Sequence, residues 1–216
     1  MDGDDQAFVL LLLSDGNLPT GSFVASSGLE SYLKHGFSAS QSDPTTAFLR
    51  DSLETYARSA LPFVSDAHCV LGQVRQGCGD DQELLGSVLT DLLALDELYH
   101  ATTPNHVARR ASQAQGVALL TLYAKGFSRP ESSGRSKEDH RLYYLIDRLK
   151  LSVRRGETHG HLPICWGVLT GALGLSLGKF LLSGMEEQTA DSSSKNDPSS
   201  CICFCMQGTF CPHRFV

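Results

Sequence analysis

The sequence predicts an all-α protein, and two observations lead to this fold class. Leucine occurs 32 times, against 11 valines and 3 isoleucines, so the β-branched residues that strands favour are scarce. Apolar residues recur at helical spacing through most of the chain up to residue 177. Residues 184–200, by contrast, are rich in Glu, Asp, Ser and Asn and show no apolar period. We therefore expect one helical-bundle domain of about eight helices with a disordered C-terminal tail.

Local signals place the helices along the chain. Asp43-Pro44 is a typical helix start, with Asp as the N-cap and Pro in the first turn. The clearest amphipathic helix runs from Glu83 to His100, where the leucines share one face. Thr103-Pro104 is read as the start of the next helix. The predicted helices cover, in chain order, about residues 8–13, 26–34, 44–57, 63–77, 83–100, 103–126, 142–149 and 163–177.

These signals divide the chain into three parts. Residues 1–6 are predicted to be a flexible N-terminus, and residues 7–178 the all-α domain. Residues 179–216 are predicted to be a disordered linker and a Cys-rich tail. The boundary is set where the apolar periodicity ends at Gly178.

Charge and hydropathy exclude several function classes. The net charge is −6, which argues against a general nucleic-acid binder because such proteins present a basic face. The acidic N-terminus lacks the basic region of a secretory signal, so a cytoplasmic location is expected. Residues 162–178 carry no charge, but Pro163 and several glycines dilute their hydrophobicity. This stretch is therefore interpreted as a buried helix of a protein with no membrane contact.

The seven cysteines are unevenly distributed, and four of them lie in the last 16 residues. Cysteine and histidine together suit zinc, copper or nickel, so the tail is a weak candidate for a metal site. Its Cys-x-Cys spacing is unusual for zinc, and a tail with no selected role is the competing interpretation. The weak metal candidates are Cys201, Cys203, Cys205, Cys211 and His213.

No motif of the sequence indicates catalysis. The pair His159 and His161 would supply two ligands, which leaves a metal site half built. The segment from Gly174 to Phe180 has the wrong glycine spacing for a phosphate-binding loop and no Ser or Thr after Lys179. Paired acid and base residues or a nucleophile motif are not visible either. We therefore expect a protein that is not an enzyme and has no metal site beyond the weak candidates of the tail.

Three segments, taken together, resemble the urease accessory protein F family (UreF), in particular its plant members. The first is the apolar run, turn and Ser-x-Gly-Leu-Glu pattern of Leu11–Glu30. The second is Arg109–Leu119, and the third begins with His161-Leu-Pro and continues to Leu175. Their order and spacing agree with the family over about residues 7–177.

The resemblance implies an all-α, non-catalytic adaptor in urease maturation. Members bind accessory protein D/H and then the GTPase accessory protein G, and the complex docks on apo-urease to support GTP-dependent nickel insertion. Nickel is then handled by the complex, and no cofactor is bound stably by this chain. Family members often form homodimers and continue with further helices after the Gly-Leu segment. Without those helices, two alternatives stay open: an inactive truncated isoform, or a small metal-binding protein using its tail.

The resemblance also assigns candidate residues. Asp15 lies in an exposed loop, and Glu30 is a candidate contact for the GTPase. The adjacent Arg109 and Arg110 suit either internal bridges or an interface, because neighbouring helix positions diverge by about 100°. His161 completes the candidate partner-binding set as a residue of the family pattern. The residues assigned to the structural motif are Pro19, Gly21, Phe23, Gly28, Ser112, Gly116, Pro163 and Gly167.

Overall fold

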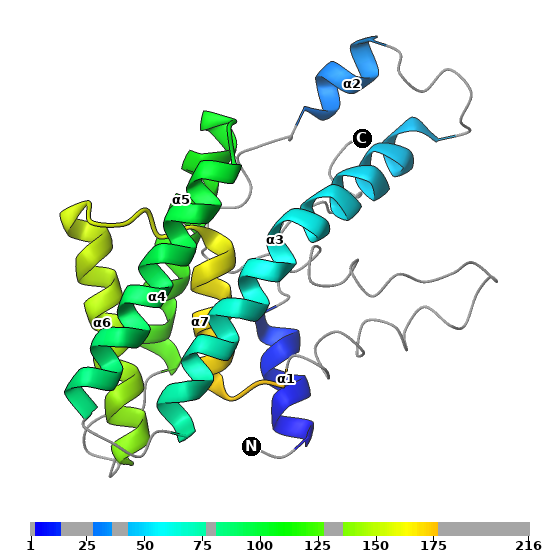
Figure 1. Cartoon of the computed structure of the whole chain (residues 1–216). Coiled ribbons are helices and arrows are strands. Elements are labelled where there is room, and N and C mark those ends of the chain that lie inside the picture. Colours follow the sequence, from blue (N-terminus) through cyan, green and yellow to red (C-terminus); the bar gives the residue numbers. More distant parts are fainter. Residues whose placement is uncertain (1–2, 14–27, 36–42, 77–80, 128–135, 177–216) are drawn as a thin grey trace. The chain divides into compact units, whose positions relative to one another are not determined.

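A computed structural model describes residues 3–13, 28–35, 43–76, 81–127 and 136–176 (Figure 1). Within these ranges the chain is all-α, as predicted, and contains no strand. A π-helical turn, Tyr123–Phe127, extends the fifth helix. The α-helices are α1 (Gly3–Leu13), α2 (Leu29–His35), α3 (Pro44–Gln76), α4 (Asp81–Thr102), α5 (His106–Leu122), α6 (Lys137–Arg155) and α7 (Leu162–Leu173).

The described residues fall into two compact units, and the boundary between them along the chain falls within α3. The first unit contains α1, α2 and α3 up to Leu61, and in it Tyr32 packs on Phe48 with 5.1 Å between ring centroids. The second unit contains α3 from Pro62 onward and all of α4, α5, α6 and α7. The division into a helical domain and a tail remains a prediction, because the tail lies outside the described residues.

The predicted helix start is right at α3 and two residues early at α5. Asp43 directly precedes α3, and its carboxylate accepts a hydrogen bond from the Thr45 amide at 3.1 Å. At α5 the N-cap is Asn105 and not Thr103. The Asn105 side chain accepts from the amides of Val107 and Ala108, so it satisfies two of the otherwise unpaired first amides.

Helix α3 joins two segments that were predicted as separate helices. It is 33 residues long, and Pro62 lies inside it. Proline has no N–H to donate to the carbonyl of Arg58, one turn earlier, so sequence rules expect an end or a kink there. The helix nevertheless continues, and the unit boundary falls at this proline.

Helix α7 forms the core of the second unit. Every residue from Leu162 to Ala172 is buried, and Figure 1 shows α7 among α3, α4 and α5. Its largest side chain, Trp166, is 2 % exposed. The large buried side chains that the other helices contribute are Leu71 of α3, Leu92 of α4, Leu119 and Leu120 of α5, and Leu142, Leu145, Ile146 and Leu149 of α6.

Glycines let α7 and its preceding loop approach neighbouring backbones closely. A methyl group at Gly167 would lie 2.5 Å from the Val64 carbonyl oxygen of α3. A methyl group at Gly116 of α5 would lie 2.2 Å from the Gly160 carbonyl oxygen. Both distances are far below van der Waals contact, so these positions require glycine for packing.

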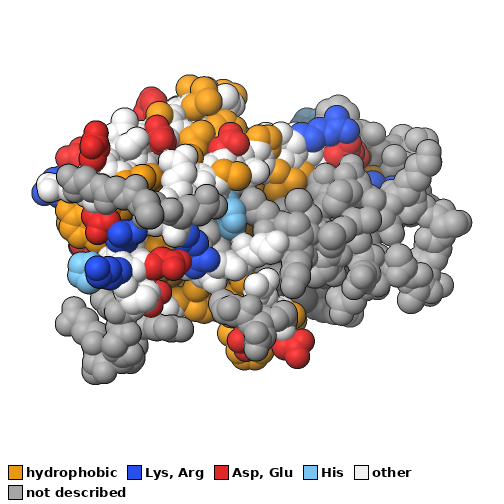
Figure 2. Space-filling view, turned by 60° about the horizontal axis from the view of Figure 1, so that its bottom comes forward, with side chains coloured by type: hydrophobic (Ala, Val, Ile, Leu, Met, Phe, Trp, Pro, Cys, Tyr) orange, Lys and Arg blue, Asp and Glu red, His pale blue; other side chains and the backbone are white. Residues whose placement is uncertain are grey.

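The surface of the described residues mixes both signs of charge. Figure 2 shows acidic, basic and apolar side chains interspersed over one face. In the second unit, Arg141 pairs with Asp81 at 2.5 Å and Arg75 with Glu138 at 3.1 Å, which links α6 to α4 and α3. Among the helices of the described part, none is long and apolar enough to span a bilayer.

Replacing Gly167 by alanine tests the close packing of α3 on α7. The added methyl group would meet the backbone of α3 at 2.5 Å, so one of the two helices must shift. We expect Gly167→Ala to lower the free energy of unfolding by about 1–3 kcal/mol, measured by urea denaturation.

Gly72→Ala in α3 is the matched control, because a methyl group there meets no atom within 4 Å. Alanine is the better helix former, so this variant should be unchanged or more stable by about 0.5–1 kcal/mol. Equal stabilities of the two variants would contradict the proposed close contact.

Candidate functional site

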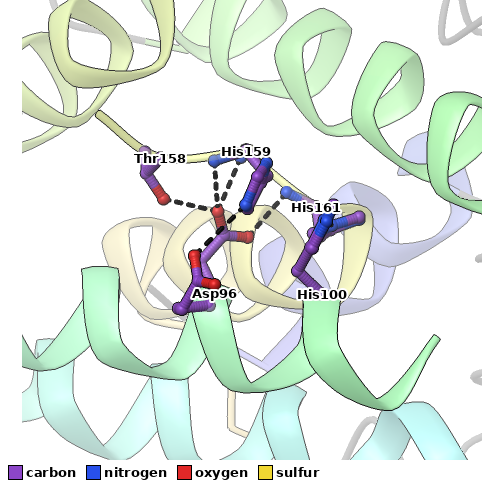
Figure 3. Close-up of polar contacts among 7 residues, drawn as sticks. Asp96, His100, Thr158, His159 and His161 are labelled. Atoms are coloured by element: carbon purple, nitrogen blue, oxygen red, sulfur yellow. Dashed lines mark hydrogen bonds and ion pairs between the residues drawn. The ribbon is translucent and has the colours of Figure 1, made fainter. Parts of the chain in front are cut away.

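A polar network holds the segment that precedes α7, and its centre is the carboxylate of Asp96. Asp96 lies on α4, and its side chain points toward residues 158–161 (Figure 3). Its Oδ2 accepts from the Thr158 hydroxyl at 2.5 Å and from the amides of His159 and Gly160, both at 2.7 Å. Its Oδ1 accepts from the amide of His161 at 2.8 Å. Four donors therefore surround one buried carboxylate.

Local backbone geometry creates this anion site. Gly160 has φ of +69°, a left-handed conformation that glycine adopts without strain, and it turns three successive amides toward one point. The positive end of the α7 dipole lies at the same place, which favours a negative charge. Asp96 is only 1 % exposed, so the four hydrogen bonds replace the water that its charge has lost.

Ser112 of α5 supports the first turn of α7. His161 is the N-cap residue of α7 but makes no side-chain cap bond itself. The Ser112 hydroxyl oxygen accepts the Leu162 amide at 3.0 Å and takes over that role from another helix. The same oxygen lies 3.2 Å from Nδ1 of His161. The close approach at Gly116 brings α5 near enough for both contacts.

His161 is buried and bonded on both ring nitrogens. Its side chain has no exposed surface, and its Nε2 lies 3.0 Å from Nδ1 of His100. The ring also meets Tyr99 edge-on, with centroids 5.1 Å apart. Burial lowers the pKa of His161 from 6.5 to about 4; the Asp96 charge opposes this shift. The neighbouring His100, His159 and Arg109 add to it. The imidazole of His161 is therefore neutral at pH 7.

His100 and His159 extend the network to the surface. Their rings stack with 3.6 Å between centroids and a 9° angle between planes. Nε2 of His159 lies 3.2 Å from the Glu97 carboxylate, whose side chain is 70 % exposed. Burial lowers the pKa of His100, with further lowering by His159 and Arg109, while Glu97 and Asp96 raise it.

The C-terminal end of α7 is held by α3. The Arg75 guanidinium donates to the Ala172 carbonyl at 3.2 Å, at the end where the helix dipole is negative. His68 lies 3.2 Å from the Thr170 hydroxyl, and burial, with the charge of Arg75, lowers the pKa of His68. Both ends of the buried helix are thus bonded by polar side chains of other helices.

The polar atoms of this network are bonded to one another and to backbone groups. The Ser112–His161 pair has the spacing of a nucleophile and a base, but both residues are buried. The second nitrogen of His161 faces His100, and Asp96 is bonded to backbone amides instead of orienting the ring. In the described ranges no group of three or more His, Cys, Asp or Glu side chains could hold a metal ion.

The structure separates the residues predicted to bind partners. The Arg109 Nε donates to the Thr103 carbonyl, so this side chain is used internally, whereas Arg110 is exposed. Glu30 is exposed on α2. His161 is fully buried and offers no surface to a partner in this conformation. Asp15 lies outside the described residues, so its role stays a prediction.

Several residues of the predicted structural motif occupy positions that explain their type. Gly28 precedes α2 with φ of +96°. Pro163 lies in the first turn of α7, where a missing N–H costs nothing. Ser112, Gly116 and Gly167 make the contacts described above. Pro19, Gly21 and Phe23 lie outside the described residues, as do the weak metal candidates Cys201, Cys203, Cys205, Cys211 and His213.

Sequence reasoning did not single out Asp96, the centre of the network. A signal was available, because Asp96 continues the buried face of α4 formed by Val88, Leu92 and Tyr99. A carboxylate on such a face requires buried donors. His100 was also missed as a partner of His161, because 61 residues separate the two in the chain.

Comparison with known proteins places this chain in a family. The family model of UreF matches residues 40–190. The chain belongs to the UreF family. The match includes the second and third of the segments that resemble the family, and with them Asp96, Ser112 and His161. The first segment, Leu11–Glu30, precedes the matched range.

Curated relatives of this UreF chain carry the same family name or function. It is 36 % identical over 204 residues to urease accessory protein 6 of Cryptococcus neoformans, which covers 80 % of this chain and 64 % of the relative. It is 28 % identical over 176 residues to an uncharacterized UreF-like urease accessory protein of Schizosaccharomyces pombe. This match covers 82 % of this chain and 64 % of the relative. It is 28 % identical over 172 residues to UreF of Paenarthrobacter aurescens, and this match covers 78 % of this chain and 61 % of the relative.

The chain therefore spans slightly less than two thirds of the length of these relatives. No solved structure gives a significant match.

Replacing Asp96 by asparagine tests the centre of the network. The amide removes the charge and places an NH₂ group among backbone N–H donors that need an acceptor. Hydrogen bonds to charged groups contribute about 1.5–3 kcal/mol each, so we expect Asp96→Asn to lose at least about 3 kcal/mol of unfolding free energy. Urea denaturation measures this loss.

Glu97→Gln is the matched control, one residue away on the same helix. Its side chain is 70 % exposed, and its carboxylate pairs with the His159 ring. Exposed ion pairs contribute at most about 1 kcal/mol, so Glu97→Gln should unfold nearly as wild type does. If Asp96→Asn lowered the free energy of unfolding by no more than Glu97→Gln does, Asp96 would not hold the segment.

Stability should depend on pH through His161. The folded pKa is about 4, whereas the unfolded side chain titrates near 6.5, so between these values the unfolded chain binds more protons. The contribution of the neutral His161 ring to the free energy of unfolding is complete above pH 6.5. It is lost as the pH falls toward 4, at up to about 1.4 kcal/mol per pH unit. Urea denaturation at pH 7, 6 and 5 measures this slope, which His161→Gln should flatten.

A slope that is the same in wild type and in His161→Gln would assign the pH dependence to other groups.

Proposed function

We propose that this chain is a non-catalytic accessory protein of urease maturation, which supports GTP-dependent nickel insertion into apo-urease. It would act as an adaptor between accessory protein D/H and the GTPase accessory protein G. The observation that carries the proposal is the UreF family match over residues 40–190. The names of the relatives, which are urease accessory proteins in fungi and a bacterium, point the same way. Nickel is the cargo of this process.

The arrangement of polar groups suits an adaptor better than an enzyme. Asp96, Ser112 and His161 are all buried, and their hydrogen-bonding atoms contact protein groups. Such a network fixes the core and leaves the outer helix faces to meet partners. An adaptor of this kind works by binding one state of the GTPase more tightly than another, which shifts its population toward that state. We propose that it does so in the cytoplasm and as a homodimer.

Arg110 is the best candidate for a partner contact among the described residues. Arg109 beside it is bonded to the Thr103 carbonyl, so the two arginines have different roles. Arg110 is exposed on α5, and a guanidinium there is available to a carboxylate of another protein through two parallel hydrogen bonds. Glu30, exposed on α2, is the candidate of opposite charge.

The function is tested by complementation. The chain is expressed in a urease-producing host that lacks its own F component and retains accessory proteins D/H and G. Restored urease activity in nickel-containing medium is the expected result. If a longer family member restores activity and this chain does not, the proposed function fails for this chain.

A charge reversal at Arg110 tests its role as a contact. In pull-down experiments with accessory proteins D/H and G, Arg110→Glu should reduce capture at least tenfold, because reversal replaces an attraction by a repulsion. Arg148→Glu is the control, since Arg148 is exposed on α6, where its guanidinium lies 5.8 Å from the Tyr144 ring centre. Equal capture of both variants would remove Arg110 from the interface.

A further inference from the structure

Three imidazoles and one carboxylate connect the buried start of α7 with the surface. His161 is bonded to Ser112 on one side and to His100 on the other. His100 stacks on His159, whose side chain is 31 % exposed. Figure 3 shows these rings beside the Asp96 carboxylate that binds the same segment. The segment 158–161 is therefore held twice, by Asp96 and by the imidazole pair.

The contact between His100 and His161 accommodates one hydrogen atom only. Its two nitrogens are 3.0 Å apart, so one of them donates N–H and the other accepts it. One added proton can go to the nitrogen outside the contact on the ring that donates, because the outer nitrogen of the accepting ring already carries a hydrogen. A second added proton would set two N–H groups against each other and break the contact. The first already places a positive charge on rings that are partly or fully buried.

The groups around the His161 ring decide how this charge is received. Asp96 attracts it, but this carboxylate already accepts four hydrogen bonds. Arg109 repels it, and Val153, which faces Gly160 from α6, is apolar. The titratable or charged groups are Asp96, Glu97 and His100 from α4, Arg109 from α5, His159 from the segment itself and Cys165 from α7. Burial raises the pKa of the Cys165 thiol, which therefore stays neutral.

We propose that the His100–His161 pair is an acid-sensitive lock that releases residues 158–161 from Asp96 when the pair becomes charged. A protonated ring is stabilised by water, which it reaches only if the segment moves outward. Gly156, which precedes the segment and has φ +73°, and Gly160, which lies inside it and has φ +69°, are positions where the chain can change direction with little steric cost. Release would free the three amides on Asp96 and unfasten the first turn of α7.

Opening is measured by amide hydrogen exchange of the full chain between pH 7 and pH 5, corrected for the pH dependence of intrinsic exchange. The reporters are the amides of His159, Gly160 and His161, which are bonded to Asp96. With a pKa of about 4 in the closed state and 6.5 in the open state, their protection factors should fall roughly 20-fold. Amides within α7, such as those of Val168 and Leu169, report global unfolding, and their protection factors should fall less.

Two variants separate the lock from other acid effects. His161→Gln keeps a polar group near the position of Nε2 but does not titrate, so the fall in protection at residues 159–161 should disappear. His140→Gln removes an exposed histidine of α6 by the same substitution and should retain the full fall. The inference is overturned if protection at residues 159–161 is unchanged between pH 7 and pH 5. It is also overturned if protection at Val168 and Leu169 falls by the same factor, or if His161→Gln loses protection as wild type does.

Nitrogen NMR of the wild-type chain provides a reading that needs no variant. With ¹⁵N-labelled histidine, the two nitrogens of the contact should share one hydrogen at pH 7, one as donor and one as acceptor. Signals showing both of these nitrogens protonated at pH 7 would contradict the lock. So would protonation of His161 near pH 6.5 without loss of protection at residues 159–161.

Discussion

The second unit depends on burying α7 while satisfying the polar groups at its two ends. Helix ends carry unpaired amides or carbonyls, and each one buried without a partner costs about 1–3 kcal/mol. Asp96 and Ser112 bond the N-terminal end, and Arg75 bonds the C-terminal end. The carboxylate and the guanidinium also match the signs of the helix dipole. Because these partners come from α3, α4 and α5, they fix which residues of the apolar interior face one another.

Much of this arrangement was predictable from local sequence, and the rest depends on distant pairings. Leucine periodicity predicted the helices, and Asp43-Pro44 predicted the start of α3, because both are properties of neighbouring residues. The two helices expected at about residues 44–57 and 63–77 are one, because α3 continues through Pro62. The bonds of Asp96 join residues 62 to 65 positions apart, and no local pattern encodes such a partner.

The His159-Gly160-His161 sequence shows why spacing alone misleads. As a pattern it suggests a pair of metal ligands, since both imidazoles are two residues apart. The positive φ of Gly160 directs the two imidazoles to different partners. His161 bonds to Ser112 and His100 in the interior, whereas His159 stacks on His100 and bonds to Glu97. The backbone amides of all three residues donate to Asp96. In this chain the sequence therefore orders the start of α7.

The position of Trp166 has an optical consequence. It is the chain's one tryptophan, it lies in the middle of α7, and it is 2 % exposed. Light emitted by the indole after excitation near 295 nm therefore comes from the interior of the second unit alone, with no contribution from the first. A red shift of this emission would indicate that water has reached α7. The fluorescence of Trp166 therefore reports whether the central helix of the second unit is buried.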